Sequence, residues 1–291
     1  MAILAFDWGG TNIKFGVWHD ERLLGQGLFP TPKSLESLEA QLLSTKKELE
    51  KSYDFEGVAI SAPGAVNYDT GVIEGISAIP YIHHFGIRER LSELFQLPVK
   101  IENDANAAGI AEVWQGVAKG LSNVLFIVIG TGIGGAILQN GKVNVGAHRY
   151  GGEFGLMYMD KDNTFSGVGT GVKMAQRYAE RKGLPADSIS AKEVFELASQ
   201  GDVLAQEEEN NFYDYLAQGL FSLQFCFDPE CLVLGGGVSA KEGLAEEITK
   251  RVQVLMDQHN LKDFKPDIRV CHFKNDANLI GAVASYYQQM E

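Results

Sequence analysis

Two glycine turns share a pattern whose residue types suit phosphate binding. The first is Asp7-Trp8-Gly9-Gly10-Thr11, and the second is Gly130-Thr131-Gly132-Ile133-Gly134-Gly135. Glycines let backbone N–H groups approach an anion closely, and each threonine adds a hydroxyl donor. Asp7 stands at the mouth of the first turn, where its carboxylate could bind Mg²⁺ directly or through water.

The segments around these turns also repeat. Leu4–Leu23 aligns without a gap with Val124–Val143, so that Phe6 matches Phe126. In both copies an apolar run reaches the turn and a second apolar run follows, which predicts a β-hairpin. A single glycine turn is most simply a tight hairpin. Two turns at a fixed repeat, with Gly235-Gly236-Gly237 after another predicted strand, favour phosphate binding and two related lobes with a cleft between them.

A third polar group, Glu102-Asn103-Asp104, lies where a short predicted strand meets an alanine-rich helix. Asp104 could simply be the N-cap of that helix. It could also be a general base, because a partly desolvated carboxylate at the end of a buried strand can accept a proton from a substrate hydroxyl. In phosphoryl transfer such an aspartate mainly orients the attacking oxygen.

Alternating strands and helices must position these motifs, and they predict an α/β fold. We expect strands at 2–6, 14–19, 23–29, 57–61, 99–102, 124–129, 135–138, 232–234 and 268–272. We expect helices at 34–51, 87–95, 105–115, 171–182, 191–200, 203–225, 240–258 and 278–289. The predicted domains are a smaller lobe at 1–117 plus 275–291 and a larger lobe at 118–274.

Composition narrows the function classes. The chain has 291 residues, of which 45% are hydrophobic and 22% charged, as expected of a globular protein with two domains. Its formal net charge of -13 argues against a nucleic-acid partner, which needs a basic face. The sequence contains no run of about 18 apolar residues, so no membrane span is expected. The N-terminus does not resemble a signal peptide. The three cysteines are expected to be buried and fit a reducing cytoplasm.

Six motifs, in this order, resemble those of the ROK family, a group of bacterial sugar kinases, related repressors and open reading frames. They are Asp7-Trp8-Gly9-Gly10-Thr11, Ser61-Ala62-Pro63-Gly64, Glu102-Asn103-Asp104-Ala105-Asn106-Ala107, Gly130-Thr131-Gly132-Ile133-Gly134-Gly135, Gly152-Glu153-Phe154-Gly155 and Leu234-Gly235-Gly236-Gly237-Val238. The resemblance covers nearly the whole chain. It implies the actin-like ATPase (sugar kinase) fold, with two RNase-H-like lobes and a cleft between them.

The resemblance also implies an activity and residue roles. The protein would transfer the γ-phosphoryl group of ATP to a hydroxyl of a hexose or hexose derivative, with Mg²⁺ as cofactor. Asp104 matches the catalytic base, and the substrate-binding positions are Asn103, Glu153, Pro63 and Gly64. The positions that match ATP binding are Asp7, Gly9, Gly10, Thr11, Gly130, Thr131, Gly132, Gly235 and Gly236, of which Asp7 is associated with Mg²⁺. A cytoplasmic homodimer is expected.

The sequence departs from the family pattern at the zinc loop. Leu156 replaces a histidine that contacts the sugar and binds zinc, and the segment 159–167 contains no cysteine. A tetrahedral zinc site needs four ligands, so no structural zinc is expected. We expect packing to hold the loop instead, through Phe154, Met157, Tyr158 and Phe165.

The sugar pocket departs from the pattern as well. Ala78 replaces a sugar-contacting asparagine, and His83 or His84 could substitute for it unless both are solvated loop residues. Glucose, N-acetylmannosamine, a β-glucoside such as phosphorylated cellobiose, and fructose all stay open as substrates. The alternative function is a non-catalytic sugar-responsive regulator of the same family. A DNA-binding regulator is disfavoured, since the first strand is expected to start at Ala2 and leave no room for a helix-turn-helix.

Overall fold

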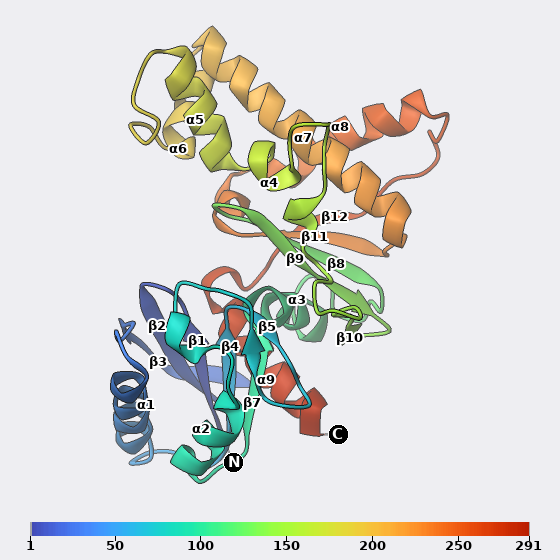
Figure 1. Ribbon diagram of the computed structural model, residues 1–291. Coiled ribbons are helices and arrows are strands. Elements are labelled where there is room, and N and C mark those ends of the chain that lie inside the picture. Colours follow the sequence, from blue (N-terminus) through green and yellow to red (C-terminus); the bar gives the residue numbers. More distant parts are fainter. Residues whose placement is uncertain (1, 291) are drawn as a thin grey trace. The chain divides into compact units, whose positions relative to one another are not determined.

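The computed structural model describes residues 2–290 (Figure 1). The chain divides into two compact units. Unit 1 comprises Met1–Gly120, Val145–Gly151 and His272–Glu291, and unit 2 comprises Leu121–Asn144 and Gly152–Cys271. Each unit is built around a five-stranded sheet.

Unit 1 is an α/β/α layer structure around the sheet β3-β2-β1-β4-β7. Its strands are β1 (Ala2–Trp8), β2 (Asn12–His19), β3 (Arg22–Pro30), β4 (Phe55–Ala62) and β7 (Val99–Asn103), with a separate pair β5 (Ala65–Val66) and β6 (Ile73–Glu74). Helices α1 (Leu35–Leu49) and α2 (Ile87–Phe95) share a core with Leu4, Phe6 and Trp8 of β1. Helices α3 (Asp104–Trp114) and α9 (Ala277–Met290) pack together, and α9 contacts β1, β4 and β7.

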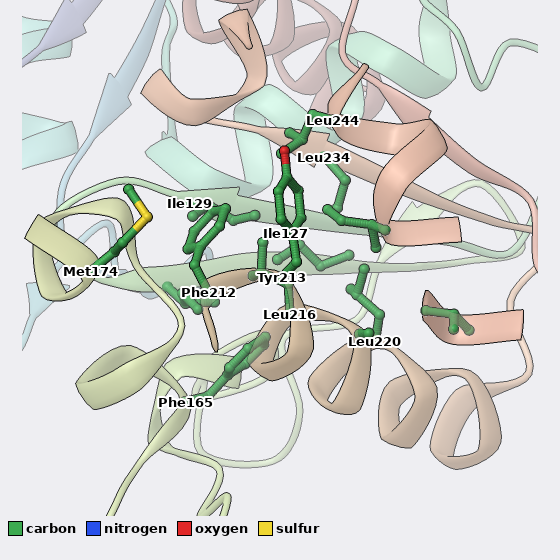
Figure 2. Packing of buried hydrophobic residues seen from close by; sticks show 14 of the residues in the cluster. Ile127, Ile129, Phe165, Met174, Phe212, Tyr213, Leu216, Leu220, Leu234 and Leu244 are labelled. Atoms are coloured by element: carbon green, nitrogen blue, oxygen red, sulfur yellow. The ribbon is translucent and has the colours of Figure 1, made fainter. Parts of the chain in front are cut away.

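Unit 2 has the sheet β10-β9-β8-β11-β12. Its strands are β8 (Val124–Ile129), β9 (Ile133–Gln139), β10 (Lys142–Val143), β11 (Cys231–Gly235) and β12 (Ile268–Val270). Its helices are α4 (Phe165–Val168), α5 (Gly171–Arg181), α6 (Ala191–Ser199), α7 (Val203–Phe227) and α8 (Leu244–Gln258). Figure 2 shows the core of this unit, in which Ile127, Ile129 and Leu234 of the sheet gather with Phe212, Leu216 and Leu220 of α7.

The described residues also form four short 3₁₀-helices. They are η1 (Pro80–Ile82), η2 (Phe154–Leu156), η3 (Gly237–Ala240) and η4 (Lys274–Asp276). No helix in the part of the chain that the structure covers is both long and apolar enough to cross a membrane.

The two sheets have one topology. When only the five strands of each sheet are counted along the chain, the strand order in both sheets is third, second, first, fourth, fifth. The first three strands are antiparallel neighbours, and the fourth and fifth run parallel to the first. The predicted pair of RNase-H-like α/β lobes, and the repeat that suggested it, are thereby confirmed.

The ungapped alignment of the repeat is wrong by one residue in the first strand. Trp8 pairs with Ile13 across the first hairpin, whereas Ile129 pairs with Ile133 across the second, so the second turn is one residue shorter. The residue equivalent to Phe6 is therefore Ile127. Phe126 faces the opposite side of its sheet, because side chains alternate along a strand. The matching core residues are Leu4, Phe6 and Trp8 in unit 1 and Leu125, Ile127 and Ile129 in unit 2.

Two further expectations are wrong. The helix predicted at 240–258 begins only at Leu244, because Gly243 at φ 75° breaks the chain direction before it. Cys226 is exposed near the end of α7, although Cys231 and Cys271 are buried as expected. An amphipathic helix end can leave a small residue on its solvent side, which the sequence pattern alone did not reveal.

Candidate functional site

Asp7 lies near the end of β1 and is held by three other elements of unit 1. The residue is only 7% exposed. Its Oδ1 accepts hydrogen bonds from Ser61 Oγ on β4 and from Asn278 Nδ2 on α9, each at 3.0 Å. Nζ of Lys14, the antiparallel partner of Asp7 on β2, lies 3.7 Å from Oδ2. The orientation of this carboxylate is therefore fixed from β2, β4 and α9.

The turn between β1 and β2 is built on close backbone approaches. Thr31 Oγ1 donates a hydrogen bond to the carbonyl of Gly9 at 2.6 Å, which anchors the start of the turn. A Cβ on Gly10 would lie 2.7 Å from the Cβ of Ala78, so only glycine lets the loop before η1 come this near. Thr11 is exposed. The predicted phosphate loop thus has an exposed hydroxyl on a firmly held backbone.

Asp104 is the first residue of α3, but it is not the N-cap. Asn103 caps the helix, since its Oδ1 accepts from the backbone N–H of Asn106 at 3.1 Å. Oδ1 of Asp104 accepts from Asn103 Nδ2 at 3.0 Å and from the N–H of Ala105 at 2.9 Å. Burial raises the pKa of the Asp104 carboxyl above its ordinary value, and the negative charge of Asp7 raises this pKa further. A carboxylate with a raised pKa and one oxygen without these bonds suits proton acceptance.

Glu102 forms a buried polar network behind Asp104. Its Oε1 accepts from Tyr68 Oη at 2.7 Å, from the N–H of Asn103 at 2.9 Å and from Asn106 Nδ2 at 3.2 Å. Its Oε2 accepts from Ser285 Oγ on α9 at 2.8 Å. Burial raises the pKa of the Glu102 carboxyl, and the four hydrogen bonds oppose that shift. This network connects the start of α3 to α9 and to the loop after β5.

Pro63 and Gly64 connect β4 to β5 and lie beside the Asp104 segment. The carbonyl of Gly64 accepts from Asn103 Nδ2 at 3.1 Å, so one amide group contacts both the loop and the Asp104 carboxylate. Gly64 has φ 110°, and a Cβ there would lie 2.9 Å from Cε1 of His83. The structure therefore brings together Gly64, Asn103 and Asp104 among the residues predicted for sugar binding and catalysis.

The two histidines after η1 differ in environment. His83 is 8% exposed, and its Nε2 lies 2.7 Å from Ser77 Oγ. Burial lowers the pKa of its imidazole, which favours the neutral ring. His84 is exposed. The interpretation of both as solvated loop residues is therefore wrong for His83, which is buried and lies close to Gly64.

Unit 2 contains a cavity of about 1010 Å³ next to its glycine turn. Gly130 and Thr131 form one part of the wall, and the segment after β11 forms another. Nζ of Lys241 lies 4.3 Å from the centre of the Phe195 ring and 3.4 Å from Glu209, so a cation covers this aromatic face. The remaining charged and polar lining comes from Lys192, Glu196, Ser199 and Glu242.

Gly235 and Gly236 are not part of this lining, but they shape the turn that leads into it. A Cβ on Gly235 would lie 2.5 Å from the Phe126 ring. Gly236 has φ 86°, and a Cβ there would lie 2.3 Å from the carbonyl oxygen of Ile129 at the end of β8. Both glycines let the chain turn tightly, so that Gly237 and the residues after it line the cavity.

Glu153 is presented to solvent by a tightly packed glycine motif in unit 2. A Cβ on Gly152, which has φ 93°, would lie 2.3 Å from the carbonyl oxygen of Gly135. A Cβ on Gly155 would lie 2.1 Å from the carbonyl oxygen of Ile133. These glycines press the segment onto β9, while Glu153 between them is exposed.

The loop that carries zinc ligands in the family pattern is closed by other means. Tyr158 is 74% exposed, so the expectation that it packs is wrong. Oδ1 of Asp160 accepts from the N–H groups of Asp162 at 2.8 Å and Asn163 at 2.9 Å, an Asx-type turn. Within residues 2–290 no group of three or more His, Cys, Asp or Glu side chains gathers to hold a metal ion. The expectation of packing is confirmed for the other three residues, since Phe154 and Phe165 belong to the core of unit 2 and Met157 packs against it.

The residues present fit ATP and Mg²⁺. The cavity of unit 2 is large enough for a nucleoside and is bordered by a glycine turn with a threonine hydroxyl. Mg²⁺ in kinases is held by one or two carboxylates together with phosphate oxygens and waters, so a cluster of protein ligands is not required. Asp7 can supply such a carboxylate oxygen, because Oδ2 has a lone pair beyond its ion pair with Lys14.

Several residues of this site were not found from the sequence. Ser61, Asn278 and Lys14 fix Asp7, and the antiparallel register of the hairpin could have identified Lys14 in advance. Tyr68 and Ser285 complete the network around Glu102 from distant segments. No local sequence signal marks such long-range partners.

Comparison with known proteins places the chain among sugar-phosphorylating enzymes. The model of the ROK family matches residues 3–289. A β-glucoside kinase from Listeria monocytogenes is 35% identical over 99% of this chain and 98% of its own.

Two solved structures extend the comparison. A ROK family protein from Streptococcus pneumoniae in complex with sucrose has a TM-score of 0.92 and 37% identity, over 100% of this chain and 99% of its own. A ROK family glucokinase from Streptomyces griseus in complex with glucose and AMPPNP has a TM-score of 0.77 and 25% identity, over 99% of this chain and 100% of its own. The fold is thus that of sugar kinases with two actin-like lobes.

Proposed function

Because this chain belongs to the ROK family, we propose that it is an ATP-dependent sugar kinase that transfers the γ-phosphoryl group of ATP to a hydroxyl of a hexose unit. Among acceptors we favour a β-glucoside, since the β-glucoside kinase of Listeria monocytogenes matches the chain over almost its full length. The nucleotide complex of the Streptomyces griseus relative supports ATP as donor. A kinase of this kind uses cellular ATP, so we propose a cytoplasmic location.

Asp104 carries the proposal. Its carboxylate is fixed by Asn103 and Ala105, is partly buried, and has a raised pKa. In the proposed mechanism it orients the acceptor hydroxyl toward the γ-phosphorus and accepts its proton as the new O–P bond forms and the bond to ADP breaks. Asn103 also contacts the Gly64 loop, so it can fix the loop and the base together.

The glycine turns would bind the polyphosphate. In the proposal, Gly9, Gly10 and Thr11 and the equivalent Gly130, Thr131 and Gly132 donate backbone and hydroxyl hydrogens to phosphate oxygens. The nucleoside would occupy the cavity of unit 2. Mg²⁺, when bound near Asp7, would neutralise charge on the transferring group. Glu153, exposed beside β9, would accept a hydrogen bond from a sugar hydroxyl.

The test is ADP release by the purified protein with Mg²⁺·ATP and a panel of glucose, cellobiose, N-acetylglucosamine, N-acetylmannosamine and fructose. Asp104→Asn should lower kcat by about 10²–10⁴-fold with an unchanged melting temperature. Asp202→Asn is the matched control, because Asp202 is the N-cap of α7 and accepts from the N–H of Ala205, from Tyr178 Oη and from Lys182 Nζ, none of which is assigned to substrate or ATP. Wild-type turnover by Asp104→Asn would refute the assignment of the base.

A further inference from the structure

The segment Val145–Gly151, called the strap here, belongs to unit 1, although the residues before and after it in the chain belong to unit 2. The N–H of Gly151 donates to the carbonyl of Val145 at 2.9 Å, which closes the strap into a compact turn. Arg149 within it has φ 63°, a left-handed conformation that a long side chain seldom adopts. The strap is therefore an ordered turn with a strained residue at its end.

A weak ion pair joins the strap to β6. Nη1 of Arg149 lies 3.2 Å from Oε2 and 3.4 Å from Oε1 of Glu74. The two side chains are 29% and 45% exposed, so the pair is partly solvated. Surface ion pairs of this kind contribute little to stability, and the left-handed backbone conformation of Arg149 lowers it. Stability therefore does not explain why Arg149 is held at this position.

The ion pair is linked to the proposed base by a short chain of contacts. The carbonyl oxygen of Glu74 lies 3.0 Å from the position of a Cβ on Gly64. The carbonyl of Gly64 accepts from Asn103 Nδ2 at 3.1 Å, and the same amide group donates to Asp104 Oδ1. All of these residues lie in unit 1. The strap thus contacts Glu74 of β6, whose backbone lies against Gly64.

Two exposed apolar side chains flank the pair. Tyr150 follows Arg149 and is 68% exposed, and Ile76 follows Glu74 by two residues and is 93% exposed. A pyranose ring presents C–H groups on its face and hydroxyls at its edge. Aromatic and aliphatic side chains suit the former, while guanidinium and carboxylate groups suit the latter. Here both kinds of group are adjacent.

We propose that Arg149, Glu74 and Tyr150 bind the second ring of a β-linked disaccharide, while Asp104 acts on a hydroxyl of the first ring. Arg149 and Glu74 hydrogen-bond to hydroxyls of the second ring, and Tyr150 packs against its face. Because the ion pair is weak and solvated, exchanging it for sugar hydroxyls costs little. This inference rests on the proposed function and narrows its favoured acceptor from β-glucosides in general to β-linked disaccharides.

The test compares kcat/KM for cellobiose with kcat/KM for glucose in the wild type, Arg149→Ala, Tyr150→Ala and Glu74→Gln. We expect each variant to lower the cellobiose-to-glucose ratio about 10-fold or more, mainly through the KM for cellobiose. Arg90→Ala is the matched control, because Arg90 forms a comparable ion pair with Glu39 in unit 1. Its ratio should equal that of the wild type.

Other outcomes separate this inference from the proposed function. A wild type that phosphorylates glucose but neither phosphorylates nor binds cellobiose overturns this inference and leaves the proposed function standing. The inference is also overturned if the variants lower kcat/KM for cellobiose and for glucose by the same factor. A wild type that phosphorylates no sugar overturns the proposed function. In that case calorimetric binding of cellobiose that is lost in Arg149→Ala still supports the second-ring site, and binding that persists in Arg149→Ala overturns it.

Discussion

Glu102 offers the sharpest test of how the site is held together. Its carboxylate is buried and accepts four hydrogen bonds, from Tyr68, Ser285, Asn103 and Asn106. Glu102→Ala removes the acceptor for all four donors, and the hydrogen bonds from Asn106 and Ser285 are buried. Leaving a buried donor unpaired costs about 1–3 kcal/mol. Allowing for donors that find water, we expect a loss of about 3–5 kcal/mol in the free energy of unfolding.

Glu102→Gln separates hydrogen bonding from charge. An amide oxygen at the position of Oε1 keeps the bonds from Tyr68, Asn103 and Asn106. The amide NH₂ at the position of Oε2 can donate to Ser285 Oγ, which already accepts from Gln289 Nε2 at 2.8 Å and has a second lone pair. We therefore expect Glu102→Gln to lose only about 1 kcal/mol at neutral pH.

The pH dependence gives this prediction a sign. Burial raises the pKa of Glu102 in the folded state above its unfolded value. The folded state then binds its proton more tightly, so the contribution of Glu102 to stability is greatest below the unfolded pKa and falls as pH rises through the folded pKa. The stability of the wild type relative to Glu102→Gln should therefore decline from acidic to neutral pH. Urea unfolding at several pH values measures both quantities, and a wild type that gains relative stability over this range would refute the reasoning.

Three further predictions concern single contacts. Asp7→Asn removes the negative charge that raises the Asp104 pKa, so the acidic limb of the residual kcat/KM–pH profile should move to lower pH; an unmoved limb would contradict the coupling. Gly64→Ala should raise the sugar KM several-fold, by about 1 kcal/mol or more, because its Cβ would collide with the residues beneath the loop. Gly75→Ala, also at positive φ but with open space around it, should leave KM unchanged, and equal effects would refute the steric account. If the expected homodimer uses the exposed end of α7, Phe225→Asp should halve the mass measured by light scattering, since this aromatic ring is 52% exposed; an unchanged dimer would place the interface elsewhere.

Elements with strong local signals could be predicted well from the sequence. The helix at Ile87–Phe95 and the strand at Val124–Ile129 agree with prediction at both ends. The strand is a continuous apolar run between polar turns, and the helix has its apolar residues on one face. The short pairs β5–β6 and β10–β9 were not predicted in full, because two-residue strands carry too little pattern.

The candidate site was predicted only as far as its motifs extend. Asp104 and Asn103 were found because they follow a strand directly, but their hydrogen bonds to Gly64 and to each other depend on tertiary structure. The Tyr158 prediction failed for a similar reason, because an Asx-type turn at Asp160 closes the loop with little burial. Hydrophobicity alone does not show which aromatic of a short loop faces the core.

Three consecutive residues at the β7–α3 junction have different tasks, and the geometry of the junction explains why. Glu102 lies in the strand with its side chain toward α9, where Ser285 meets it. Asn103 takes the N-cap position and satisfies the N–H of Asn106. Asp104 is therefore not needed as the cap and has an oxygen to spare. If Asn103 were replaced by alanine, Asp104 would lose the amide that fixes its carboxylate, and the uncapped N–H groups of the first turn of α3 would favour its use as a substitute cap. We expect Asn103→Ala to lower kcat more than its loss of about 1 kcal/mol in stability would suggest. Asn103→Asp keeps the cap but not the amide donor, so it should recover stability without recovering kcat. Recovery of both by Asn103→Asp would show that capping alone is the role of Asn103.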